Sequence, residues 1–92
     1  MKFILTFAMT PESGRRDDAI ERFKKTGGLP PKGATLIKRW IASDFSGGFV
    51  LLESNDPLAL THFGLQWSDV CTLRIVPVVE DDELVEVLKR AA

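Results

Sequence analysis

The stretch that decides the fold is GFVLLES, residues 48–54, in which apolar residues occupy both alternating sets of side chains. A strand that alternates apolar and polar residues buries one face, whereas a strand that is apolar in both sets is buried on both faces. Residues 2–9, KFILTFAM, show the same pattern. The sequence therefore predicts that these two segments are the central strands of one sheet.

Two further segments have the character of edge strands. Residues 34–43 carry Lys38 and Arg39 at their middle, and charged side chains are typical of strands that lack one neighbour. Residues 71–79 include Pro77, which has no N–H to donate to a sheet and is confined to edges and bulges. We expect these segments to flank the two central strands.

The connection between the second and third strands sets their register. Residues 44–47, DFSG, are typical turn residues, so we expect a turn of four residues. This turn places Lys38 opposite Glu53, a pair of opposite charges. Trp40 then faces Leu51, an aromatic side chain against an aliphatic one.

Helix signals mark the first and last helical segments. Thr10 or Ser13 offers an N-cap for a helix that follows the first strand, and Gly27 is a typical helix end. Acidic residues at 80–83 and basic residues at 89–90 suit the two ends of a C-terminal helix, because they oppose its dipole.

The middle helix has the strongest start signal. Asp56 is a favourable N-cap, and Pro57 follows at the first helical position. The helix is expected to run to about Trp67, and residues 57–68 contain no charged side chain. Two apolar stripes result, so this helix is expected to need a neighbour on each side. The stripes are Leu60, Phe63 and Trp67, and Leu58, His62 and Leu65.

The order strand, helix, strand, strand, helix, strand predicts an α+β fold, the ferredoxin-like βαββαβ arrangement with a C-terminal helix. Its antiparallel four-stranded sheet has the first and third strands in the middle. Residues 1–92 form one domain, because no linker, repeat or low-complexity tract divides them. A sheet buried on both faces needs more cover than the helices of 92 residues supply, so we expect a homodimer.

Composition excludes several functions. Lys and Arg total 12 against 13 Asp and Glu, which gives no field that would attract nucleic acid or an anionic membrane. No stretch approaches a membrane span or a signal peptide. Cys71 is the single cysteine and His62 the single histidine, so we expect no disulfide, no metal and no cofactor. These features favour a soluble cytoplasmic protein whose partner is a small apolar molecule.

Five residues are candidates for a functional site. His62 is the candidate catalytic residue, since histidine is the side chain that most often acts as a general base or proton donor. The candidate ligand-binding residues are Trp40, Phe63 and Trp67, as aromatic walls, and Arg39, which can bind a carboxylate or phosphate. Core packing of the aromatic residues and a solvated arginine are the competing interpretations.

Glycine, proline and tryptophan positions along nearly the whole chain carry a family resemblance. The chain resembles a small bacterial family of domains of unknown function in the dimeric α+β barrel, ferredoxin-like superfamily. This resemblance implies a homodimer whose two sheets face each other across a barrel, forming a dimeric α/β barrel, and it implies no activity. The segments that carry it are TGGLPPKG at 26–33, Arg39-Trp40, Gly47-Gly48-Phe49, Trp67 and Val76-Pro77-Val78.

The superfamily also contains cofactor-independent monooxygenases, haem proteins and isomerases, which commonly hold a ligand between the helices and one face of the sheet. Two functions follow as hypotheses. The first is a homodimeric protein that binds a small apolar ligand or acts as an accessory or interaction protein. The alternative is a cofactor-independent monooxygenase-like or isomerase-like enzyme for a small aromatic substrate, with His62 as proton shuttle.

Overall fold

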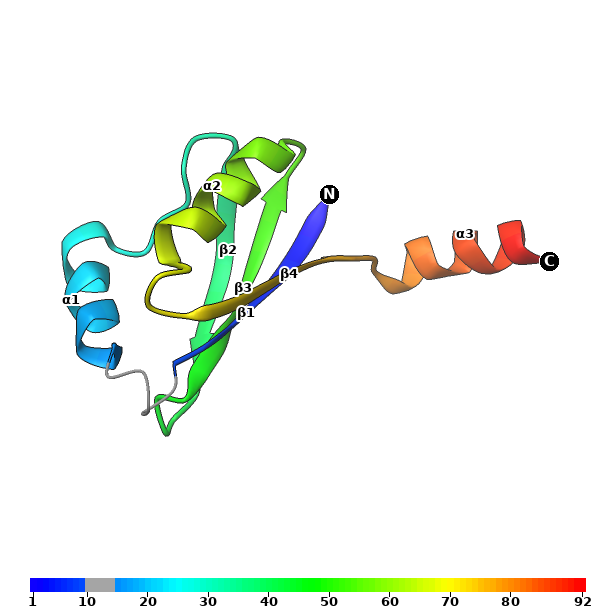
Figure 1. The fold of residues 1–92 in the computed structure, drawn as a ribbon. Coiled ribbons are helices and arrows are strands. Elements are labelled where there is room, and N and C mark those ends of the chain that lie inside the picture. The colour runs from blue at the N-terminus through cyan, green and yellow to red at the C-terminus, as the bar shows by residue number, and fades with distance from the viewer. Residues whose placement is uncertain (10–14) are drawn as a thin grey trace.

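The structure, a computed structural model, describes residues 1–9 and 15–92. The elements follow in the predicted order (Figure 1). The proposed N-caps Thr10 and Ser13 lie outside the described residues. The elements are β1 Lys2–Ala8, α1 Arg16–Thr26, β2 Ala34–Ile41, β3 Gly47–Ser54, α2 Pro57–Trp67, β4 Thr72–Val78 and α3 Asp81–Ala91.

The four strands form one antiparallel sheet in the order β2-β3-β1-β4. The prediction that β1 and β3 are central is confirmed, as is the edge position of β2 and of β4 with Pro77. This strand order, with two helices between strands and a third at the C-terminus, confirms the predicted α+β class and is consistent with a ferredoxin-like fold.

The predicted register between β2 and β3 is wrong. Lys38 pairs with Leu51 rather than with Glu53, and Trp40 pairs with Phe49. The predicted charge pair therefore does not form across these strands, and the two aromatic side chains are neighbours instead.

The position of the β2–β3 connection sets this shift, whereas the irregularity just after Leu36, the signature of a bulge, displaces only the pairing of residues 34–36. The strands pair up to Ile41 and Gly48, and the Ala42 N–H donates to the Gly47 carbonyl oxygen at 2.8 Å, so the connection spans 42–46 rather than the expected 44–47. Phe45 adopts a positive φ of 59° within this connection, a conformation that a turn residue of this size rarely takes.

One face of the sheet packs against α2. Asp56 caps this helix as predicted, because its side chain accepts a hydrogen bond of 3.0 Å from the Leu58 N–H. The first of the two apolar stripes supplies the core, and its residues Leu60 and Phe63 are 6% and 3% exposed. The core cluster consists of Leu5, Val50, Leu52, Leu60 and Phe63.

The opposite face of the sheet, here called the outer face, keeps large apolar side chains exposed. Trp40 and Phe49 point to it and are 45% and 53% exposed. Helix α3 projects away from the rest of the domain (Figure 1), and none of its residues is buried. The domain therefore leaves two apolar surfaces uncovered, one on β2 and β3 and one on α3.

Candidate functional site

A pocket of about 470 Å³ lies between α1, α2 and the inner face of the sheet, the face that packs against α2. Its lining is almost entirely apolar and contains several aromatic rings, which is the usual character of a small-molecule site. Ligand sites of proteins commonly have volumes of about 300–1,000 Å³, so the size also fits. The described lining residues are Leu5, Phe7, Met9, Ala19, Ile20, Phe23, Lys24, Gly28, Arg39, Ile41, Phe45, Val50, Phe63, Trp67, Cys71 and Leu73.

The floor of the pocket depends on two glycines of β3. A Cβ on Gly47 would lie 1.9 Å from the carbonyl oxygen of Phe7 on β1. A Cβ on Gly48 would lie 2.7 Å from the Phe7 ring and 2.2 Å from the Trp40 carbonyl oxygen. Both positions therefore require glycine: the β1 backbone lies against Gly47, and the Phe7 ring occupies the space beside Gly48. The Gly47-Gly48-Phe49 segment of the sequence is explained by this packing.

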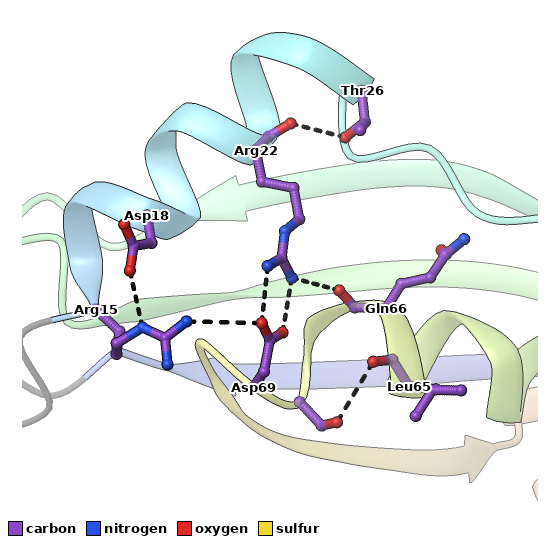
Figure 2. A network of polar contacts seen from close by, with 8 residues as sticks. Arg15, Asp18, Arg22, Thr26, Leu65, Gln66 and Asp69 are labelled. Atoms are coloured by element: carbon purple, nitrogen blue, oxygen red, sulfur yellow. Dashed lines mark hydrogen bonds and ion pairs between the residues drawn. The ribbon is translucent and has the colours of Figure 1, made fainter.

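Helix α1 forms the roof of the pocket, and polar contacts hold its exposed side (Figure 2). Arg22 makes two hydrogen bonds, of 2.7 and 2.8 Å, to the two carboxylate oxygens of Asp69. It also donates to the backbone oxygen of Gln66, at 2.6 Å, and its guanidinium lies 5.6 Å from the centre of the Trp67 ring. This bidentate geometry fixes α1 to the end of α2 and the loop that follows it.

The same contact sets the charge state of Asp69. Hydrogen bonds from Arg22, reinforced by its positive charge and by that of Arg15, lower the pKa of the Asp69 carboxyl to about 2. Arg15 Nη2 lies 3.7 Å from Asp69 Oδ2, and Arg15 Nε lies 2.8 Å from Asp18 Oδ2. The Asp69 carboxylate is therefore ionised throughout the physiological pH range.

Arg39 joins the far end of α1 to β2. Its Nη1 donates to the carbonyl oxygen of Gly27 at 3.2 Å, and its Nη2 donates to that of Gly28. The guanidinium lies 5.1 Å from the centre of the Phe23 ring, a cation–π arrangement. Burial lowers the pKa of Arg39 from its ordinary value. Arg39 is thus a partly desolvated cation at the pocket wall.

The glycine pair after α1 makes this arrangement possible. Gly27 ends the helix in the left-handed conformation, with a φ of 71°. Gly28 has a φ of 63°, and a Cβ there would lie 2.8 Å from Arg39 Nη2 and 2.9 Å from Phe23. A side chain at Gly28 would therefore displace the arginine from the pocket wall.

Three of the five predicted site residues lie together at the pocket. Arg39, Phe63 and Trp67 all line it, although Arg39 comes from β2 and the two aromatic residues come from α2. Whether they bind a ligand stays a prediction.

The structure places Trp40 and His62 elsewhere. Successive side chains of a strand point to opposite faces, so an inward Arg39 turns Trp40 to the outer face, where it packs beside Phe49. His62 is exposed on the side of α2 away from the pocket, with its Nε2 3.5 Å from the Gln66 amide nitrogen. The second apolar stripe of α2 is exposed with it, and Leu65 is 74% exposed.

Several residues that line the pocket were not among the candidates predicted from the sequence. Phe45 lines the pocket from the β2–β3 connection, and a large aromatic residue among turn residues was the available signal. Ile20 and Lys24 of α1 and Cys71 also line it. Burial, together with the charge of Asp69, raises the pKa of the Cys71 thiol, which keeps it protonated and weakly nucleophilic.

Possible metal ligands gather at another place in the described part of the chain. Carboxylates of Glu80, Asp82 and Glu83 lie within 4.8 Å of one another and are exposed at the start of α3. Glu80 and Glu83 form a capping box there, so helix capping accounts for two of the three carboxylates.

No helix of the described residues has the length and apolar character needed to cross a membrane, and the cytoplasmic location stays a prediction.

Comparisons with known proteins agree with the resemblance drawn from the sequence. A comparison with curated proteins found no match. A family model described as a domain of unknown function, DUF3303, matches residues 1–92, the whole chain. The protein therefore belongs to the DUF3303 family.

Proposed function

We propose that this protein is a homodimer that binds a small apolar molecule in the pocket beneath α1. The observation that carries the proposal is the pocket itself, about 470 Å³ in volume with an almost wholly apolar lining. A domain of this size has a small core and a small free energy of unfolding. Leaving so much apolar surface in contact with water is costly, and a bound apolar molecule would recover that burial.

Binding is favoured over catalysis by the titratable groups at the pocket. The described lining contains Lys24, Arg39 and Cys71 but neither a histidine nor a carboxylate. A general base is expected within hydrogen-bond reach of the proton that it removes, and His62 lies on the other side of α2. The enzyme hypothesis depends on His62 as the proton shuttle, and His62 does not line the pocket.

The dimer is supported by the two uncovered apolar surfaces. Trp40 and Phe49 are about half exposed on the outer face, and Leu84 and Leu88 of α3 are 44% and 60% exposed. An isolated helix as short as α3 is marginally stable in water without packing. Because both surfaces belong to the same chain, a twofold arrangement lets each copy cover the surfaces of the other.

Charge complementarity also favours a second copy as the occupant. Lys38 and Arg74 project from the outer face, as their pairing with Leu51 and Thr6 shows. Helix α3 carries acidic residues 81–83 in its first turn. The acidic first turn of α3 therefore complements the cations of the outer face, while its last turn carries Lys89 and Arg90.

The ligand site is tested by an amide-resolved NMR titration with octanol as the apolar probe. We expect shifts at the pocket lining, such as at Leu5 and Leu73. Ile20→Trp fills the pocket and should abolish these shifts, whereas Glu21→Trp, on the adjacent exposed position of α1, should preserve them. Shifts confined to the outer face, or equal binding by the two variants, would contradict the proposal; if Ile20→Trp fails to fold, the map on the wild-type protein decides.

The dimer is tested by sedimentation equilibrium. We expect a mass about twice the 10.2 kDa of the chain. Phe49→Asp should give the monomer mass, because it places a charge in the proposed interface. Leu65→Asp is the matched control, since Leu65 is even more exposed, at 74%, but lies on α2. A monomeric wild-type protein, or dissociation by both variants alike, would reject this arrangement.

A further inference from the structure

The charged side chains that line the pocket are both positive. Among its described lining residues, Lys24 and Arg39 are the charged ones, and no acidic side chain accompanies them. Lys24 directly follows Phe23, whose ring the Arg39 guanidinium covers. Two cations in an otherwise apolar lining favour a ligand that carries a negative charge.

The contacts of Arg39 leave its charge uncompensated. Within the described part of the chain, its hydrogen bonds go to the backbone oxygens of Gly27 and Gly28, which carry only partial charge. A guanidinium has five N–H donors, and two hydrogen bonds do not exhaust them. The partial burial of this side chain makes a missing counter-ion costly.

We propose that the ligand is an apolar monocarboxylate, whose carboxylate binds Arg39, with Lys24 as the second cation of the lining, while its hydrocarbon part contacts the apolar and aromatic side chains of the pocket. This inference rests on the proposed function and specifies its ligand class. The planar guanidinium matches a carboxylate and can donate two parallel hydrogen bonds to it. The remaining lining is apolar, so the ligand has one charged group and no second polar one.

Arg39 is also placed to couple the ligand to the fold. It contacts the residues that end α1 and lies on β2, so it bridges the roof and the floor of the pocket. A carboxylate at this point would contact a side chain that is already oriented by two hydrogen bonds and one aromatic ring. Such preorganisation reduces the entropy lost on binding.

The test compares three probes that share one chain length and differ in the head group. Titration calorimetry at neutral pH uses octanoate, octanol and octylammonium with the full-length protein. We expect octanoate to bind about 10- to 100-fold more tightly than octanol, which corresponds to a charged hydrogen-bonded contact, and octylammonium to bind most weakly. Added salt should weaken octanoate binding and leave octanol binding unchanged.

Two arginine variants locate the effect. Arg39→Met should remove the advantage of octanoate over octanol, while Arg74→Met, on the outer face of β4, should retain it. Equal binding of octanoate and octanol to the wild-type protein would overturn the carboxylate assignment and leave the apolar pocket standing. Binding of none of the probes at the pocket would reject the proposed function itself. If Arg39→Met does not fold, the head-group ranking on the wild-type protein and on Lys24→Met decides whether the carboxylate assignment holds.

Discussion

Helices α1 and α2 cover the same face of the sheet in different ways. Helix α2 packs directly on the sheet through Ala59, Leu60 and Phe63, all 6% exposed or less. Helix α1 buries only Ala19 among its residues, and polar contacts of Arg22 and Arg39 hold it in place. The difference shows how a small domain keeps a pocket: one helix supplies the core, and the other is held over a space that it does not fill.

The largest expected effect distinguishes the two helices by their packing. Leu60→Ala should lower the free energy of unfolding by about 2–5 kcal/mol, the usual cost of removing a buried leucine side chain. Ile20→Ala, on α1, should cost about 1 kcal/mol, because its side chain faces the pocket rather than a filled core. Urea unfolding measures both variants. Equal losses would show that α1 packs as tightly as α2.

The next effect concerns the polar attachment of α1. Arg22→Met removes both hydrogen bonds to Asp69, so the amides of α1 should exchange with solvent faster. The amides of α2 should keep their protection, because its apolar packing is unchanged. Hydrogen exchange read by mass spectrometry separates the two helices, and Arg16→Met, an exposed change in α1, is the control. Faster exchange in α2 and α1 together would contradict separate attachment.

The pH dependence of α1 follows from the lowered pKa of Asp69. A folded-state pKa of about 2, below the ordinary 3.8, means that this contact contributes fully above about pH 4 and is lost as the pH falls towards 2. The protection of α1 amides should therefore decrease over this window. In Asp69→Asn the protection should be lower from the start and should change less with pH. A wild-type profile that Asp69→Asn reproduces unchanged would assign the transition to other carboxyl groups.

The smallest expected effect is at His62. Its side chain is exposed on α2 and does not line the pocket, so His62→Ala should change the free energy of unfolding by no more than about 0.5 kcal/mol. Octanoate affinity should also stay within about twofold, well below the change expected for a charged contact. Urea unfolding and calorimetry on the same preparation measure both. A large loss of octanoate affinity in His62→Ala would indicate that His62 contributes to ligand binding.

The parts of the fold that could be predicted depend on local patterns. The apolar runs at 2–9 and 48–54 identified the central strands, because burial on both faces leaves a direct trace in composition. Asp56 and Pro57 identified the start of α2 by capping chemistry that acts within a few residues. The edge strands followed from Pro77 and from the charges in β2.

The remaining features depend on contacts between distant residues. The β2–β3 connection lies at 42–46 rather than at 44–47, which moved the register of these strands and with it the neighbour of Trp40. Arg22 of α1 contacts Asp69 across 47 positions of sequence, which no local pattern reveals. The sequence therefore identified Arg39, Phe63 and Trp67 as candidates but did not show which candidates line the same pocket.

The most direct test of the pocket is hydrogen exchange of the wild-type protein with and without saturating octanoate. A ligand that fills the space beneath α1 should slow exchange in α1 and at the glycines that follow it, while α2, already packed, should change little. Slower exchange confined to β2 and β3 on the outer face, or no change in α1 at saturation, would contradict the account.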